Sequence, residues 1–565
     1  MSESRAVPVR FAGLRAGSAP LSWGQHAIWK SIRWLGEESH YFNIPRAVPV
    51  PPGCPVDAVT AAVERLIHRH EALRSTFADT PAGPVQTVAG EGAAEVEVFE
   101  AGRPVPREEA LELAQRLAGR AFDHATGFGM RYAVVTAGGE PVWLLLVVSH
   151  QCTDFFGIRV IEAELATLLA GGEPDPADWH PLDQARFQQG GEGAARGRAS
   201  LDFWRRTLTR VPRSHFDFAR TGGPADPADP GEPADPERFV RLRLDSPAGA
   251  VAADLLATRC QVSTSTVLLT AAAAVVAAYS GHDTAVLQLI AGNRNEPRLR
   301  GMVGAQTENA LFVLNVADGT FEDAVRRCFL PGMSAYRFGE YHPPSMDAVH
   351  DEVRLHRGVG LDLSSFFNDV RMNDRWESLP ETDGSAEQLA ALAERSEISF
   401  IGAWPRQDAK YFVHVQYMPD TLHLFLMADT AYLPRPVVER LLRAMEALLV
   451  RSVHGEVGLR EAAGPDRAPR PDGWVRADSC WFDLAETRRL VSAAAGGAEV
   501  RLSLAQDGPE RLVADVTATA PGTAPEELHR AVVALVEHRT DAVAPHHYRV
   551  STPSGELLAE GSGRP

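Results

Sequence analysis

The sequence predicts a mixed α/β (α+β) protein in which strands and helices alternate. Residues 56–73 carry apolar side chains at helical spacing, which indicates an amphipathic helix. Residues 141–149 read PVWLLLVVS, an apolar run of strand length, so we expect a strand that is covered on both faces. Apolar residues return at helical spacing over 158–169. His150 therefore stands where a buried strand opens into a short turn before a helix.

The remaining elements follow from the same patterns. Residues 267–279 form an alanine-rich apolar run that predicts a buried helix, and residues 411–418 (YFVHVQYM) alternate as a strand does. After a Pro- and Gly-containing stretch the pattern becomes αββαβ. Its members are a helix at 484–494, strands near 500–505 and 512–518, a helix at 525–537 and a strand near Tyr548.

The length suggests several domains or lobes. At roughly 150 residues per domain, 565 residues allow three or four of them. The stretch TGGPADPADPGEPADPE (221–237) has no apolar residue larger than alanine and cannot form a core, so we expect a solvated connector there. We predict an N-terminal lobe at 15–215, a connector at 216–238, a C-terminal lobe at 239–455, a linker at 464–473 and an appendage at 474–565.

The charge balance excludes some classes of partner. The chain has 56 Lys and Arg against 74 Asp and Glu, a formal net charge of −18. Nucleic acids and anionic membranes attract proteins with a positive field, so we expect neither as a partner. Lys30 and Lys410 are the only lysines. Small molecules or proteins are the expected partners.

Cysteine usage and the N-terminus favour a cytoplasmic location. The five cysteines are scattered and contain no CxxC pair, which disfavours both a disulfide framework and a structural zinc site, and we expect no bound metal. The first residues lack the apolar core of a signal peptide, and the longest apolar run is short for a membrane span.

The segment SHQCTDF (149–155) is the candidate for chemistry. A histidine at the end of a buried strand can present one ring nitrogen to a cleft, as a general base near neutral pH requires. Asp154 can cap the following helix or hold the turn through an ion pair. Cys152 is a possible nucleophile by position, but a small buried filler is the better interpretation because no orienting group is evident.

This segment resembles the HHxxxDG motif of condensation domains of nonribosomal peptide synthetases. Other landmarks of that family occur in the same order over roughly residues 20–453. They are LSWGQHAIW (21–29), YFNIP (41–45), RHEALRSTF (69–77), AFDHATGFGMRY (121–132) and AGNRNEPRLRGMVGAQTENALF (291–312).

The resemblance implies a fold and a reaction. The fold is that of chloramphenicol acetyltransferase-like enzymes, in which two lobes form a V-shaped pseudo-dimer around a central tunnel. Two phosphopantetheine arms of carrier proteins meet there at the second histidine of the motif, here His150. An acceptor amine or hydroxyl attacks the donor thioester, and the histidine acts as a base or as a positioning group. No cofactor is bound, since the carriers bring the substrates.

Further site residues come from the same resemblance. Asp154 and Arg294 match an ion pair that shapes the active-site loop, and Ser149 stands in place of the first, mainly structural histidine. Phe155 replaces the motif glycine, so that either the local backbone differs or the ring narrows the tunnel and selects small substrates. Gly157, Asn309 and Trp23 are the other expected tunnel residues. Arg294, Arg298 and Arg300 could meet a pantetheine phosphate, although a solvated face is the commoner role of such a cluster.

The C-terminal residues 474–565 faintly resemble the small C-terminal subdomain of adenylate-forming ligases. The segment APHHYRVSTPSGELL (544–558) looks like the closing segment of that subdomain, but Glu556 stands where the ligases have their catalytic lysine. We expect no adenylation and a docking or structural role, with an unrelated small α/β unit as the alternative.

Together these observations predict a free-standing condensation enzyme of specialised metabolism, and two rival functions stay open. Its partners would be acyl or peptidyl carrier proteins in trans and a small amine or alcohol acceptor. One rival is a degenerate, non-catalytic condensation-like domain that recruits another protein. The other is an acyltransferase that uses acyl-CoA as its donor.

Overall fold

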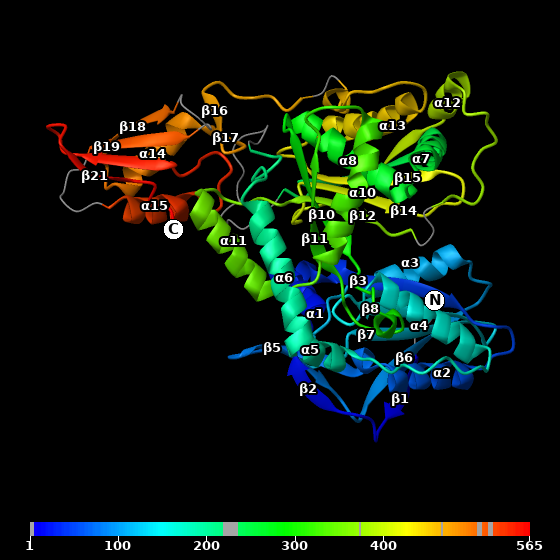
Figure 1. Ribbon diagram of the computed structural model, residues 1–565. Coiled ribbons are helices and arrows are strands. Elements are labelled where there is room, and N and C mark those ends of the chain that lie inside the picture. Colours follow the sequence, from blue (N-terminus) through cyan, green and yellow to red (C-terminus); the bar gives the residue numbers. More distant parts are fainter. Residues whose placement is uncertain (1–4, 218–234, 372–374, 465–466, 506–510, 518–523) are drawn as a thin grey trace. The chain divides into compact units, whose positions relative to one another are not determined.

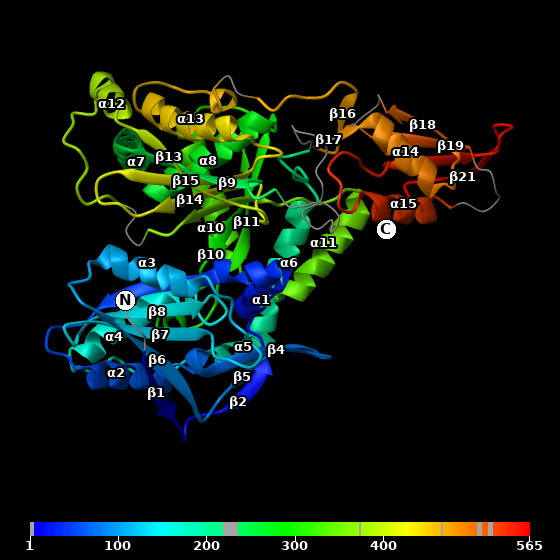
Figure 2. The same cartoon turned by 180° about the vertical axis from the view of Figure 1, so that it is seen from behind.

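The computed structural model describes residues 5–217, 235–371, 375–464, 467–505, 511–517 and 524–565. The chain forms two compact units (Figures 1 and 2). The first comprises Met1–Ala199, Ala291–Glu308 and Glu340–Pro343, and the second comprises Ser200–Ile290, Asn309–Gly339 and Pro344–Pro565. Most of the predicted connector at 216–238 and part of the linker at 464–473 lie outside the described residues.

The first unit contains a five-stranded sheet in the order β1-β6-β7-β8-β3 and a separate three-stranded sheet in the order β2-β5-β4. The strands are β1 Arg5–Phe11, β2 Gly17–Pro20, β3 Asn43–Pro49, β4 Ser75–Thr80, β5 Gly83–Val88, β6 Gly92–Ala101, β7 Met130–Ala137 and β8 Glu140–Ser149. The helices are α1 Trp23–Leu35, α2 Val56–Arg69, α3 Arg107–Ala118, α4 Phe155–Leu169, α5 Pro181–Gln189 and α9 Pro297–Arg300, with 3-10 turns at η1 Gly36–Phe42 and η2 Glu71–Arg74. Helix α6, Gly191–Leu208, begins in this unit and continues into the second.

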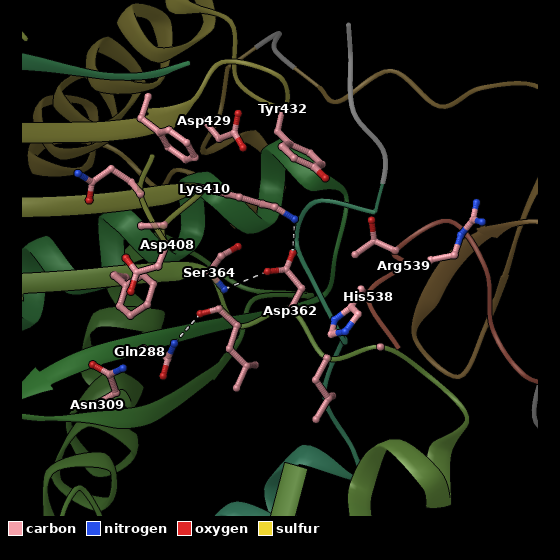
Figure 3. Close-up of a pocket in the computed structure, with 18 of the residues that line it drawn as sticks. Gln288, Asn309, Asp362, Ser364, Asp408, Lys410, Asp429, Tyr432, His538 and Arg539 are labelled. Atoms are coloured by element: carbon pink, nitrogen blue, oxygen red, sulfur yellow. Dashed lines mark hydrogen bonds and ion pairs between the residues drawn. The ribbon is translucent and has the colours of Figure 1, made fainter. Parts of the chain in front are cut away.

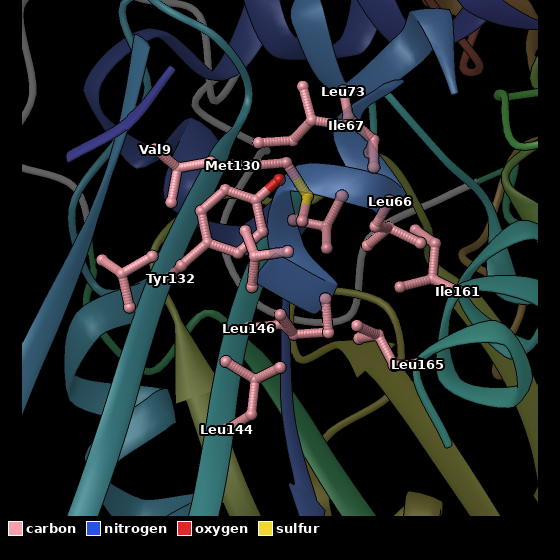
Figure 4. Packing of buried hydrophobic residues seen from close by; sticks show 14 of the residues in the cluster. Val9, Leu66, Ile67, Leu73, Met130, Tyr132, Leu144, Leu146, Ile161 and Leu165 are labelled. Atoms are coloured by element: carbon pink, nitrogen blue, oxygen red, sulfur yellow. The ribbon is translucent and has the colours of Figure 1, made fainter. Parts of the chain in front are cut away.

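Both faces of the five-stranded sheet are covered, as predicted for the 141–149 strand. Along β8, Leu144 and Leu146 belong to the core shared with α2 and α4, whereas the intervening Leu145 belongs to the cluster shared with α3. This alternation is the period-2 pattern of a strand between two helical layers. Figure 4 shows Leu66 of α2 and Leu165 of α4 directed toward the same sheet. The predicted helix at 158–169 is confirmed as part of α4. The helix predicted at 56–73 is present as α2 but ends at Arg69, and Glu71–Arg74 form the 3-10 turn η2.

The second unit contains a seven-stranded sheet in the order β11-β10-β12-β14-β15-β9-β13. The strands are β9 Phe239–Ser246, β10 Thr284–Ala291, β11 Glu308–Asn315, β12 Ser365–Asp369, β13 Glu397–Trp404, β14 Tyr411–Gln416 and β15 Leu422–Asp429. The helices are α7 Pro247–Cys260, α8 Thr264–Ser280, α10 Phe321–Arg337, α11 Pro343–Arg357, α12 Ala386–Ala393 and α13 Arg435–His454, followed by the 3-10 turn η3 Leu459–Glu461.

Helix α8 is the buried alanine-rich helix that the sequence predicts. Ser263 caps its N-terminus by accepting a hydrogen bond from the Thr266 N–H, and Gly281 ends it in the left-handed conformation with φ 73°. Among the described residues no single helix is long and apolar enough to cross a membrane; α7 and α8 meet those criteria only as a pair, bent by 107°.

The same unit includes the C-terminal appendage. Its elements are β16 Trp474–Ala477, β17 Cys480–Asp483, α14 Leu484–Ala494, β18 Glu499–Leu504, β19 Leu512–Thr517, α15 Pro525–Val536, β20 His547–Ser551 and β21 Leu557–Gly561. The predicted αββαβ order is present, and the structure adds the β16-β17 hairpin and the edge strand β21 of a β18-β19-β20-β21 sheet. Helices α14 and α15 pack on this sheet through a separate apolar core around Val532 and Tyr548.

The mixed α/β class is therefore confirmed, with one large sheet in each unit. The compact units do not follow the linear boundaries that the sequence predicts, because residues 291–308, which lie within the predicted C-terminal lobe, pack in the first unit. The physical reason is a buried ion pair and backbone hydrogen bonds that join this segment to the turn after β8.

Candidate active site

His150 lies in the turn that leads from β8 to α4, as predicted. The backbone N–H of His150 donates to the Phe42 carbonyl at 2.9 Å, and the rings of His150 and Phe42 meet edge to face with centroids 6.1 Å apart. Nδ1 is buried without a hydrogen-bond partner among the described residues, whereas the side chain as a whole is partly exposed. Burial lowers the pKa of His150 below its ordinary value, so the imidazole is neutral at pH 7. Nε2 is then the nitrogen through which this side chain can act.

Asp154 holds the turn in place through three hydrogen bonds. It is fully buried and caps α4 by accepting from the Gly157 N–H at 2.8 Å. It also accepts from Arg294 Nη2 at 2.8 Å and from the Gln306 N–H at 3.0 Å. Both functions predicted for Asp154, the helix cap and the ion pair with Arg294, are confirmed. A carboxylate with all these partners is a structural group and is not available as a base.

Arg294 also makes several hydrogen bonds within the protein. Besides Asp154, its guanidinium donates to the carbonyls of Leu299, Met302 and Gly304 at 2.6–2.9 Å. Arg298 pairs with Glu296 and lies over the Trp179 and Phe187 rings. These contacts leave Arg300 as the one exposed guanidinium of the three, which disfavours a phosphate site made by the whole cluster.

Ser149 stands where the family motif has its first histidine. Its hydroxyl group is hydrogen-bonded to another histidine, His124. Its Oγ lies 2.7 Å from His124 Nε2 and accepts from the Gln151 N–H. His124 is buried between the rings of Trp29 and Phe77, and burial lowers its pKa to about 4. The neutral imidazole of His124 can therefore accept a hydrogen bond from the Ser149 hydroxyl group. Sequence reasoning missed His124, since 25 residues separate it from Ser149 and no local pattern joins them.

Phe155 and Gly157 occupy the first turn of α4. Phe155 is half-buried and has a negative φ. The backbone at this position is therefore not in the left-handed conformation, which is the conformation that would favour the glycine of the family motif. Gly157 is the residue that requires glycine, because a Cβ atom there would lie 2.2 Å from Thr153 Oγ1. The close approach at Gly157 accompanies the hydrogen bond by which its N–H donates to the capping carboxylate of Asp154. The effect of Phe155 on substrate size stays a prediction.

The two remaining tunnel candidates lie in different units. Trp23 begins α1 in the first unit, where its buried ring packs so closely on Gly197 that a Cβ atom there would lie 2.5 Å away. Asn309 lies near the start of β11 and lines a cavity in the second unit. Their assignment to one substrate tunnel stays a prediction.

Cys152 is a buried filler. It is fully buried, burial raises the pKa of its thiol to about 12, and its Sγ occupies the space beside Gly129. Such a thiol is not a thiolate at neutral pH, so the interpretation as a nucleophile is wrong. Among the described residues there is also no cluster of three or more His, Cys, Asp or Glu side chains that could hold a metal ion.

Comparison with known proteins places this geometry in a family. The family model described as "Condensation domain" matches residues 15–341, more than half of the chain. The chain belongs to the condensation domain family. It is 24% identical over 324 residues to cyclosporin synthetase of Tolypocladium inflatum, and 29% identical over 293 residues to AMB antimetabolite synthetase AmbB of Pseudomonas aeruginosa. These alignments cover 55% and 51% of this chain but 2% and 22% of the two relatives.

Solved condensation domains share the fold. The domain that mediates chain release from the enacyloxin polyketide synthase superimposes with a TM-score of 0.59 at 21% identity, covering 80% of this chain and 85% of that one. SgcC5 from Streptomyces globisporus superimposes with a TM-score of 0.57 at 16% identity, covering 77% and 98%. At this identity the likeness establishes the fold, and the chemistry has to be argued from the residues.

Proposed function

We propose that this condensation domain joins a carrier-bound acyl group to an amine or hydroxyl acceptor in nonribosomal peptide or related specialised-metabolite biosynthesis. The observation that carries the proposal is His150 itself. Its imidazole is neutral, its backbone N–H is bonded to the Phe42 carbonyl, and the Asp154 network holds its turn, while the described residues form no hydrogen bond with Nε2. A fixed, uncharged imidazole is suited to proton transfer or to orienting a nucleophile.

The reaction is an acyl transfer from sulfur. The acceptor nitrogen or oxygen forms a bond with the thioester carbonyl carbon, and the carbon–sulfur bond breaks. The proton lost by the acceptor passes to the departing phosphopantetheine sulfur, which leaves as the carrier thiol. His150 Nε2 either relays this proton or hydrogen-bonds the acceptor in line with the carbonyl carbon.

Helix α10 offers a docking face for a carrier protein. Phe329, Leu330, Met333 and Tyr336 follow one another on one side of the helix with exposures of 53%, 72%, 55% and 41%. Large apolar side chains exposed together are typical of interaction surfaces. Exposed arginines, namely Arg326, Arg327 and Arg337, flank this face. Because carrier proteins are typically acidic, we propose that carriers supplied in trans dock here despite the negative net charge of the chain.

Replacing His150 tests the proposal. In a His150→Ala variant, we expect product formation from a loaded donor carrier and an amine acceptor to fall by at least about 100-fold, which is the usual contribution of general acid–base catalysis. Mass spectrometry of the acyl product under single-turnover conditions measures this. Binding of the loaded carrier and the thermal melting temperature should change little.

The control is His124→Gln, which alters a buried histidine in the same unit that is not proposed to touch substrate. An unchanged rate in His150→Ala would overturn the proposal. Absence of turnover with every loaded carrier, together with a stable complex with another protein, would favour the recruitment domain. Equal turnover with acyl-CoA would favour the CoA-dependent transferase.

A further inference from the structure

The second unit contains a polar cavity whose described lining does not include His150. Its volume is about 540 Å³, a size typical of sites for small organic ligands (Figure 3). The strands β9, β10, β11 and β12 contribute Phe239, Gln288, Asn309 and Phe366, and the loop before β14 contributes the run Gln407–Lys410. The opposite wall is Glu537–Thr540, at the end of α15 in the appendage.

The appendage wall is packed tightly against the lobe. At Gly360, in the loop before β12, a Cβ atom would lie 2.8 Å from the carbonyl oxygens of Val536, Glu537 and Arg539. Only a glycine allows this approach. Deeper in the appendage, Arg213 is fully buried and donates to the carbonyl oxygens of Trp481 and Ala542 at 2.6 Å. The appendage, which lies outside the residues that the family model matches, therefore forms one wall of the cavity.

Most charges that line the cavity are already compensated within the protein. Lys410 Nζ pairs with Asp362 at 2.9 Å and lies 4.1 Å from the centroid of the Tyr432 ring. Although burial alone would lower it, these two neighbours raise the pKa of Lys410 to about 12, so the side chain remains a cation. Three further pairs are Arg238 with Asp429, Glu537 with Arg354, and Arg539 with Asp541.

Asp408 is different. Among the described Asp, Glu, Lys and Arg side chains that line the cavity, it alone has no ion pair, and the residue is exposed. Two amide side chains in the same cavity, Gln407 and Asn309, also make no hydrogen bond to the described residues. Gln407 is 8% exposed, and it lies next to Asp408 in the wall of the cavity. Amide groups both donate and accept hydrogen bonds, so these side chains can bind a ligand that carries either kind of group.

The remaining lining groups restrict what that partner is. The rings of Phe239, Phe366 and Tyr432 are largely buried and present apolar surface. The carboxylates outnumber the Lys and Arg cations by four to three, and the excess negative charge is that of Asp408. Figure 3 shows Asp408, Gln288 and Asn309 on one side of the cavity, with Asp362 and His538 across from them. An anion would find every cation already paired.

We propose that this cavity binds a small organic amine in its protonated form, with the ammonium at Asp408, hydrogen bonds to Gln407 and Asn309, and an apolar part against the aromatic rings. The appendage then has a role as one wall of a ligand site. This inference goes beyond the proposed condensation activity and concerns binding alone, so it stands or falls separately from the role of His150.

Three probes of nearly the same shape test the charge requirement. Phenethylamine, 2-phenylethanol and phenylacetate differ in one polar group, and each is titrated by calorimetry into the full chain at pH 8. We expect phenethylamine to bind at least tenfold more tightly than 2-phenylethanol, and phenylacetate not to bind. Asp408→Asn should remove the preference for the amine, whereas Asp420→Asn, an exposed aspartate outside the cavity, should retain it.

Two outcomes would overturn the inference. One is phenylacetate binding as tightly as phenethylamine, and the other is unchanged amine affinity in Asp408→Asn. A Gln407→Leu variant separates shape from charge, because it should weaken the amine and the alcohol alike and leave their ratio unchanged. Melting temperatures of all variants verify that each is folded.

Discussion

At the scale of single residues, Asp154 is committed to holding the turn that carries His150. Its carboxylate satisfies the first turn of α4, the guanidinium of Arg294 and the backbone of Gln306. Gly157 is a near neighbour in the chain, whereas Arg294 and Gln306 lie 140 and 152 residues from Asp154. Asp154 therefore fixes the turn that carries His150.

Removing the charge of Asp154 should destabilise the first unit. Asp154→Asn leaves Arg294, whose side chain is 6% exposed, as a buried unpaired cation, and we expect a loss of about 3–5 kcal/mol in the free energy of unfolding. The double variant Asp154→Asn/Arg294→Met should recover part of that loss. Urea unfolding of the single and double variants measures both effects, and additive losses would contradict the pairing.

The motif departures also have their explanation at this scale. Ser149 is matched by His124, so the position remains part of a buried polar pair. Phe155 needs no unusual backbone conformation.

At the scale of elements, α10 combines a buried face with an exposed apolar face. Its buried side chains include Phe321, Val325 and Cys328, while Leu330 is 72% exposed. An amphipathic helix ordinarily places its polar side toward solvent, so the exposed apolar face calls for a partner.

Leu330→Glu tests the docking face. We expect the KM for a loaded carrier to rise at least tenfold, while kcat with a small thioester such as an N-acetylcysteamine derivative stays within about twofold, because only carrier contacts are lost. Steady-state kinetics with both donors provides the measurement. Leu557→Glu, an exposed leucine of β21, is the matched control. Parallel losses with both donors would argue against docking at α10.

At the scale of the whole molecule, buried arginines join the appendage to the rest of the second unit. Arg213 donates to carbonyls of the appendage, and Arg357 pairs with Asp478 while donating to the carbonyls of Leu208 and Val211. Guanidinium groups can satisfy several backbone oxygens at once, which suits them to joining segments that share no sheet.

Arg213→Met should loosen this attachment. We expect the loss of its charged hydrogen bonds to cost at least about 3 kcal/mol and to speed amide exchange around Trp481 and Ala542, with no change in β8 of the other unit. Hydrogen–deuterium exchange with mass spectrometry measures the effect. Arg210→Met, an exposed arginine nearby, serves as the control. Unchanged exchange in the appendage would contradict the anchoring role.

Much of the fold could be predicted from local sequence patterns. Periodicity identifies α2, β8, α4, α8 and the order of the appendage elements, because side-chain spacing directly reflects which face of an element is buried. The position of His150 at the end of a strand follows in the same way, and its identity as the candidate catalytic residue follows from the motif.

What the sequence by itself determined is thus the α/β class, the element order, the family and the loop that carries His150. Only the tertiary structure decided that His124 accompanies Ser149, that residues 291–308 pack in the first unit, and that Asp408, Gln407 and Asn309 share a cavity with the appendage. The physical reason is the separation along the chain of the residues that interact. Local periodicity is set by neighbours within one element, whereas these contacts join residues whose proximity depends on the packing and register of many elements at once.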